Sequence, residues 1–252
     1  MPPKGSPAPS LELKDKFSNW LDGTLRKSAC ADGISPGVAF TRRLNRSEYS
    51  STVRDLLNLH VNAGHALPAD GAGGEGFDNA VETLFLSPIH AEKYLEAAKT
   101  ALGYAAKEPR SRKVFLNTAP GAGLTAEQAA EKVLAEFLPR AFRRPVPAVE
   151  QQKFMDLFRV AQKCGDSYDD SVLYAMQAAM ISPHFLFRVE SPNNGREPVR
   201  LNDFELAARL SYFLWGSMPD KTLADLAAAG KLQDAAVLAT LAALWLPPLR
   251  SE

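Results

Sequence analysis

The chain has 252 residues, of which 46% are hydrophobic and 23% charged, an ordinary composition for a folded protein with an apolar core. Its 29 Lys and Arg residues equal its 29 Asp and Glu residues, so no net field attracts nucleic acid or anionic lipid. No stretch approaches the roughly 18 consecutive apolar residues of a membrane span. We therefore expect one large or two small domains that neither bind nucleic acid nor span a membrane.

The first predicted helix covers residues 11–22. Ser10 stands where an N-cap would accept a hydrogen bond from the first turn. Apolar residues then fall at helical spacing on one face: Leu13, Phe17, Trp20 and Leu21. Because the segment GTLRKSACADGISPG that follows is rich in turn formers, we expect this helix to be held loosely.

The stretch RRLNRSEYSSTVRDLLNL carries the clearest start signal, for a helix over residues 46–58. Asn45 can accept from the amides of the first turn, and Glu48 can reach back to the Asn45 backbone, which together make a capping box. Leu44 and Tyr49 suit a hydrophobic staple across that cap.

Similar cap and stripe signals predict further helices at residues 88–105, 126–138, 148–163, 168–181, 203–215 and 221–229. Pro139 should kink its helix or end it at Leu138. No run of alternating β-branched residues is present, so strands should be few or absent. The sequence predicts an all-α, multi-helix bundle-like domain with a core that includes Leu56, Leu57, Leu134, Phe137, Phe158, Met176, Phe185, Leu210 and Phe213.

A long Gly-rich loop, from His60 to Phe85, interrupts the helical pattern. A loop of this length in a compact protein is either functional or disordered. Asp70, Glu75 and Asp78 offer oxygen ligands to a hard cation, but their spacing matches no established calcium loop, so we expect no bound metal. His60 and His65 flank the start of the loop and are candidate pocket contacts, although solvated side chains are the plainer interpretation.

The remaining residues that could carry chemistry form no recognised constellation. None of the four histidines forms an HExxH motif or a His/Cys pair. In SPHFLFRVE, His184 is expected to pack among apolar neighbours with a backbone hydrogen bond, and a ligand role is the alternative. Cys30 and Cys164 form no CxxC motif, and we expect two unpaired, partly buried thiols. The catalytic residues, if any, stay unknown.

Two arginine pairs, Arg42-Arg43 and Arg143-Arg144, abut predicted helix ends. There a guanidinium can bond exposed carbonyls or pair with a carboxylate. These arginines could form a binding site for an anion. Structural pairing within the chain is favoured instead, because the chain has no net positive charge.

Several segments, in this order, resemble the planctomycete-type cytochrome c-associated proteins, which are assembled from several domains of unknown function. They are RRLNRSEYSSTVRDLL, GFDN followed by LSPIHAEKYLEAA, LPRAFRRPV, SPHFLFRVE and LSYFLWGSMPD. Proteins of this family typically carry a cytochrome c module ahead of the first segment and further helical domains after the last. The resemblance implies an extracytoplasmic (periplasmic) location, although this chain carries no export signal.

The opening MPPKGSPAPS is similar to the end of a cytochrome c module, where the methionine that ligates haem iron precedes prolines. By this resemblance Met1 is a vestigial axial haem ligand. The CxxCH motif that attaches haem c is absent from the sequence, so we expect no cofactor in this chain, whereas haem c is implied for the full-length family member. The similarity fades soon after Lys231, and we interpret the chain as an internal piece truncated at both ends, or a reading frame from a damaged gene.

The resemblance divides the chain into residues 1–28, a remnant of the cytochrome c module; 40–106, a helical unit with the Gly-rich loop; 124–191, a second unit; and 199–232, the start of a third. One hypothesis makes this block a scaffold and docking portion of an electron-transfer protein, with other redox proteins or the missing domains as partners. The alternative is a fragment of an extracytoplasmic enzyme whose pocket is lined by the Gly-rich loop and His184. A non-functional fragment is a third interpretation.

Overall fold

The computed structural model describes residues 9–31, 41–71, 78–121, 123–190 and 200–245. The chain forms two units, residues 1–39 with 193–199, and residues 40–192 with 200–252. Two of the predicted site residues, Met1 and Glu75, fall outside the described residues.

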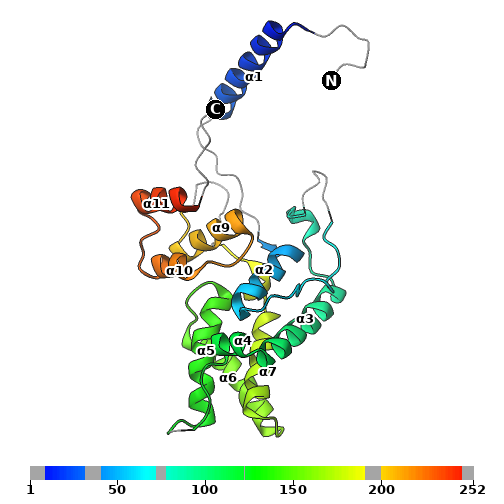
Figure 1. The fold of residues 1–252 in the computed structure, drawn as a ribbon, viewed down its shortest axis with the longest axis vertical. Helices are drawn as coiled ribbons and strands as arrows, with labels where there is room; N and C mark the ends of the chain where they lie inside the picture. The colour runs from blue at the N-terminus through cyan, green and yellow to red at the C-terminus, as the bar shows by residue number, and fades with distance from the viewer. Residues whose placement is uncertain (1–8, 32–40, 72–77, 122, 191–199, 246–252) are drawn as a thin grey trace. The chain divides into compact units, whose positions relative to one another are not determined.

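The described part of the first unit is the helix α1 (Leu11–Ala31) with the residues that precede it (Figure 1). Ser10 caps it as predicted, because its Oγ accepts from the Leu13 amide at 3.3 Å. The helix runs well beyond residue 22, since ion pairs at i,i+4 spacing, such as Arg26 with Asp22, support the added turns. The apolar stripe of α1 is exposed among the described residues, including Leu13, Phe17 and Trp20.

The second unit is almost entirely helical, which confirms the predicted fold class. Its elements are β1 (Arg42–Arg43), α2 (Arg46–Leu57), the 3₁₀ turn η1 (Val81–Thr83), α3 (Pro88–Lys107), α4 (Pro109–Phe115), α5 (Ala126–Phe142), α6 (Ala148–Lys163), α7 (Tyr168–Met180), α8 (Pro183–Leu186), β2 (Phe187–Arg188), α9 (Asp203–Trp215), α10 (Lys221–Ala228) and α11 (Ala235–Trp245). The sequence did not predict α4, α8 or α11.

The predicted caps are present and explain where the helices begin. Asn45 and Glu48 form a full capping box at α2, and Asn202 and Glu205 form another at α9. Side-chain oxygens also cap α3, α5, α7 and α10: Ser87, Thr125, Ser167 and Asp220. Each cap satisfies an amide of the first turn that has no partner within the helix.

Pro139 was predicted to kink its helix or to end it at Leu138, and the second alternative is wrong. Helix α5 continues to Phe142 with Pro139 inside it. A proline in the last turn removes one hydrogen bond, whereas Leu138, Ala141 and Phe142 are all buried, and their burial outweighs that loss.

The main core lies among α2 to α8. Helix α6 packs against α7, and α3 and α5 each pack against α7 as well (Figure 1). Predicted core residues buried there are Leu56, Leu57, Leu134, Phe137, Phe158, Met176 and Phe185. A second, smaller cluster joins α9, α10 and α11.

Three expectations about burial are corrected by the structure. Phe213 is 82% exposed, because the inward face of α9 is set by Ala207, Ser211 and Tyr212 instead. Leu210 is half-buried against the smaller cluster. Cys164 is exposed, since it is the C-cap residue of α6.

The two short strands tie distant parts of the chain together. β1 pairs with β2 in antiparallel fashion, with Arg42 opposite Arg188 and Arg43 opposite Phe187. The next amide, of Leu44, donates to the Leu186 carbonyl at 2.7 Å. The start of α2 is thereby fixed against the end of α8.

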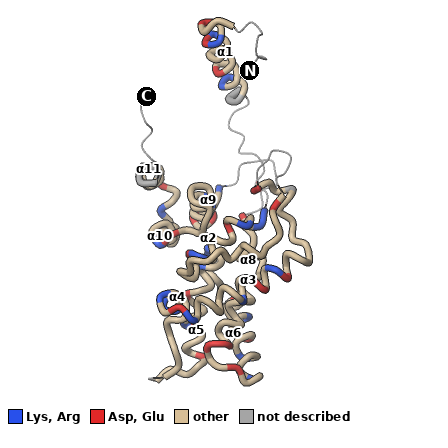
Figure 2. The backbone as a smooth tube through the Cα atoms, turned by 45° about the vertical axis from the view of Figure 1, so that its right-hand side comes forward, with Lys and Arg blue, Asp and Glu red and all other residues tan. Residues whose placement is uncertain are grey.

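Charged residues of both signs are interspersed along the helices, in keeping with the neutral composition (Figure 2). Among the described helices, none is both long and apolar enough to cross a membrane.

Candidate functional site

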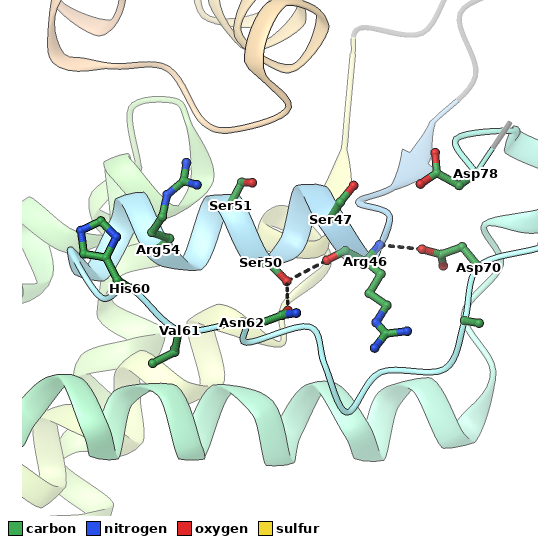
Figure 3. A pocket seen from close by; sticks show the side chains of 11 residues that line it. Arg46, Ser47, Ser50, Ser51, Arg54, His60, Val61, Asn62, Asp70 and Asp78 are labelled. Atoms are coloured by element: carbon green, nitrogen blue, oxygen red, sulfur yellow. Dashed lines mark hydrogen bonds between the residues drawn. The ribbon is translucent and has the colours of Figure 1, made fainter.

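One open pocket, of about 610 Å³, lies along α2 and is bordered by described residues of the Gly-rich loop (Figure 3). We call it the loop pocket. Its lining residues are Arg46, Ser47, Ser50, Ser51 and Arg54 from α2, and His60, Val61, Asn62, Ala69, Asp70 and Asp78 from the loop.

The loop pocket does not bring the predicted loop residues into one cluster. His60 lies beside Arg54, near the end of α2, whereas Asp70 and Asp78 lie near its start (Figure 3). A helix of this length spans about 18 Å, so the imidazole and the carboxylates stand at opposite ends of the pocket. His65 is exposed and is not among the lining residues; its backbone carbonyl accepts from Arg46 Nη2 at 2.7 Å.

Asp70 is a structural anion. Its Oδ1 accepts from Arg43 Nη2 at 2.7 Å, and its Oδ2 accepts from the Arg46 amide at 2.6 Å, at the first turn of α2. A carboxylate in that position is stabilised by the free amides and the dipole of the helix N-terminus. Both oxygens are thus committed to holding the loop on α2.

Arg43, the partner of Asp70, is almost fully buried and donates to several acceptors. Besides Asp70, its guanidinium donates to the Phe85 carbonyl at 3.0 Å, the Leu44 carbonyl at 3.0 Å and the Tyr94 hydroxyl at 3.2 Å. One buried cation therefore holds the loop at two points, at Asp70 within it and at Phe85 at its end. A structural role was predicted for the Arg42-Arg43 pair, but the partners come from residues distant in sequence and carry no local signal.

The polar groups in the middle of the loop pocket satisfy one another. Ser50 Oγ donates to the Arg46 carbonyl or Asn62 Oδ1 and accepts from the Gly64 amide, all within 3.0 Å. Arg46 Nε donates to the Gly64 carbonyl at 2.8 Å. A Cβ at Gly64 would lie 2.5 Å from Ser50 Oγ and 2.6 Å from the Arg46 carbonyl oxygen, so this approach requires glycine.

A second arginine, Arg143, connects four elements. It ends α5 in the left-handed conformation, with φ of 56°. Its Nη2 donates to the carbonyls of His184, Phe185 and Phe187, at 2.9, 3.0 and 3.0 Å. Its Nη1 donates to the Tyr212 hydroxyl at 3.3 Å. Arg143 thus confirms the structural interpretation of the second arginine pair.

A second pocket, of about 450 Å³, lies where α5, β2 and α9 meet. We call it the His184 pocket. It is lined by Phe142, Arg143, Arg144, Pro145, His184, Phe187, Arg188, Val189, Glu190, Asn202, Phe204, Glu205, Ala208 and Arg209. None of the predicted loop residues lines it, so the Gly-rich loop and His184 contribute to two separate pockets.

His184 itself is half-exposed and differs from its prediction. Its Nε2 lies 3.3 Å from Glu150 Oε1, and its ring packs on Phe142 with a centroid separation of 5.4 Å. Glu150 also receives two hydrogen bonds from Arg144, each of 2.9 Å, and these lower the pKa of the Glu150 carboxyl. The carboxylate is therefore held by Arg144 as a charged structural partner and is poorly suited to act as a general base.

The described residues contain no group of three or more His, Cys, Asp or Glu side chains that could hold a metal ion. The pocket carboxylates Asp70 and Glu190 pair with Arg43 and Arg209, and these ion pairs join segments that are distant in the sequence.

Models of three protein families match the chain in series. Residues 42–107 match PSD3, a protein of unknown function (DUF1587); residues 129–190 match PSD5, a protein of unknown function (DUF1595); and residues 201–246 match PSD4, a protein of unknown function (DUF1592). No curated protein and no solved structure matches the chain at a significant level.

Proposed function

We propose that this chain, which carries three planctomycete cytochrome c-associated domains in series, is the scaffold and docking portion of an exported redox protein. In this proposal the helical block holds its three domains in one fixed arrangement and receives a haem-carrying module. Its partners are redox proteins or further domains of the parent protein, and it works outside the cytoplasm.

One observation carries the scaffold role. The Tyr212 hydroxyl, in the third domain, lies 2.7 Å from Thr52 Oγ1 in the first domain and 3.3 Å from Arg143 Nη1 in the second. A single hydroxyl group of the third domain is thus hydrogen-bonded to both of the other domains. Arg140 adds a second link, because its Nη2 donates to the last carbonyls of α2, at 3.1 Å from Leu56 O.

Docking is attributed to α1. Its aromatic side chains Phe17 and Trp20 are each about 60% exposed, and their ring centroids lie 6.0 Å apart on one face. An apolar stripe of this kind is suited to pack on the apolar edge of a second module. Haem c would reside in that module and supply the electron-transfer chemistry.

The experiment is binding in trans of a c-type cytochrome module that carries its own CxxCH and covalent haem, taken from another protein with these domains. The module is titrated with this chain while the haem-proton NMR signals are followed. We expect saturable shifts. A Phe17→Ser/Trp20→Ser variant should bind at least about tenfold more weakly, because two large apolar contacts are lost.

A Tyr104→Ser variant is the matched control, because Tyr104 is equally exposed but lies on α3. It should bind like the unmodified chain. Absence of any binding would overturn the docking role. Equal loss of binding in the control and in the α1 variant would show that α1 is not the docking surface.

A further inference from the structure

The cations of the His184 pocket are not all neutralised by carboxylates. Arg144 has Glu150, and Arg209 is paired with Glu190. Arg143 instead donates hydrogen bonds to backbone carbonyls and to the Tyr212 hydroxyl. Arg188 is the fourth cation of the pocket, and its surroundings differ from those of the other three.

Arg188 has unused hydrogen-bonding capacity. In the part of the chain that the structure describes, no atom accepts a hydrogen bond from its guanidinium. The nearest carboxylate oxygen, Glu190 Oε1, is 3.9 Å from Nη2, beyond hydrogen-bond distance, and Glu190 is already engaged by Arg209. The guanidinium lies over the Tyr212 ring at 5.5 Å, and its side chain is only 17% exposed.

The rest of the pocket is suited to an apolar body. Phe142, Phe187, Val189 and Phe204 contribute apolar walls beside the guanidinium. Small-molecule sites commonly combine such walls with a few converging polar groups, and a volume of about 450 Å³ lies within their range.

We propose that the His184 pocket binds a small monocarboxylate with an aromatic or aliphatic body, whose carboxylate pairs with Arg188 and whose body lies against Val189 and Phe204. A carboxylate has two coplanar oxygens, which match the paired N–H groups of one guanidinium. This proposal does not rest on the docking role, because every lining residue of the pocket belongs to the second unit.

The electrostatic state of Arg188 supports this assignment. Burial lowers the pKa of Arg188 and the neighbouring Arg42 guanidinium lowers it further, whereas Glu48, Glu190 and Tyr212 raise it by less. Arg42 stands directly opposite Arg188 in the β1–β2 pair and is itself held by Glu48. A partly desolvated cation that no neighbouring carboxylate reaches by a hydrogen bond is stabilised by an incoming anion.

A phosphate dianion suits the pocket less well. It carries two charges and needs several donors, whereas Arg144 and Arg209 are each paired with a carboxylate and the carboxylates of Glu190 and Glu205 also line the pocket. We therefore expect selectivity for one negative charge joined to an apolar body.

The experiment uses the full chain and three probes: 4-phenylbutyrate, the neutral 4-phenylbutyramide and inorganic phosphate. Binding is followed by calorimetry, and the reaction of arginines with phenylglyoxal is mapped by mass spectrometry. We expect phenylbutyrate to bind saturably and to protect Arg188 from modification. An Arg188→Met variant should bind phenylbutyrate at least about tenfold more weakly, because a charge-assisted hydrogen bond is lost.

An Arg110→Met variant serves as the control, because Arg110 is an exposed cation on α4 outside the pocket. It should bind phenylbutyrate unchanged. If the Arg188→Met variant does not fold, protection of Arg188 from phenylglyoxal in the unmodified chain still tests whether the carboxylate binds there. The proposal is overturned if phenylbutyrate does not bind, if the amide or phosphate binds as tightly, or if Arg188 stays fully reactive in saturating phenylbutyrate.

Discussion

Arg43 Nη2 lies 2.7 Å from Asp70 Oδ1, and both side chains are almost completely removed from solvent. In the sequence the two residues are separated by the whole of α2 and the first part of the Gly-rich loop. Since neither charge can be solvated by water, each depends on the other and on the surrounding hydrogen bonds. The loop pocket is thus built around an ion pair that stabilises the loop on α2.

We expect Asp70→Ala to destabilise the second unit by about 3–5 kcal/mol, because it leaves the Arg43 charge buried without its partner. Urea unfolding followed by far-UV circular dichroism measures this. Asp225→Ala is the control, since Asp225 forms an exposed i,i+4 pair with Lys221 and should cost less than about 0.5 kcal/mol. Similar effects of the two substitutions would contradict the structural role of Asp70.

His90 extends the same cluster and should remain neutral at mildly acidic pH. Arg43 Nη2 lies 3.3 Å from His90 Nε2, and a guanidinium can only donate, so Nε2 accepts. The proton then resides on Nδ1, which donates to Ser87 Oγ at 2.7 Å. Burial lowers the pKa of His90, and the Arg43 charge lowers it further.

The sign of the resulting pH dependence follows from that lowered pKa. As the pH falls below about 6.5, the unfolded chain takes up the proton before the folded chain does, so the free energy of unfolding decreases. Above that pH the contribution of His90 is fully present. We expect the unmodified chain to lose more stability between pH 7 and pH 5 than a His90→Gln variant. A His90 ring that titrates at or above 6.5 by NMR would contradict the assignment.

Much of the helical fold could be predicted from the sequence because its signals are local. A capping box needs two residues three positions apart, and the boxes at Asn45 and Asn202 both form. Helix α8 was not predicted because it is a single turn. Helix α11 was not predicted because it is apolar all round and shows no amphipathic stripe. Phe213 was misplaced because the periodicity of α9 does not reveal that Tyr212 takes the inward position.

The candidate sites were much less predictable. Asp70 and His184 were named from their residue types, but their partners come from α2, β1 and α6, and such contacts have no spacing rule. Arg188 lies in the segment SPHFLFRVE, in which only His184 was predicted as a site residue. Its importance depends on which carboxylates are already engaged by other arginines, and only the three-dimensional structure reveals that.

The cap of α2 offers a third test. Asn45 Oδ1 accepts from the Glu48 amide at 2.8 Å, and Glu48 Oε2 accepts from the Asn45 amide at 3.0 Å. We expect Asn45→Ala to lower the free energy of unfolding by about 1 kcal/mol, because one amide of the first turn loses its acceptor. Asn45→Ser should restore most of that loss, since serine caps equally well. If Asn45→Ser and Asn45→Ala destabilise the chain equally, loss of the helix cap does not explain the effect of Asn45→Ala.

Two buried tyrosines allow a matched comparison in which the same atom is removed. The Tyr212 hydroxyl is bonded to Thr52 and Arg143, whereas the Tyr49 hydroxyl has no hydrogen-bond partner among the described residues. Burial raises the pKa of both phenols, so both remain protonated at neutral pH. Both rings are packed, and phenylalanine preserves that packing.

We expect the two Tyr→Phe substitutions to change stability in opposite directions. Tyr212→Phe should cost about 1–3 kcal/mol, because it leaves the buried Thr52 hydroxyl without its partner. Tyr49→Phe should stabilise the chain by roughly 1 kcal/mol, since it removes a desolvated hydroxyl that gains nothing in return. Chemical denaturation of both variants measures the difference directly. Destabilisation by Tyr49→Phe would mean that its hydroxyl has a partner after all, and an unchanged Tyr212→Phe variant would remove the bond on which the three-domain junction rests.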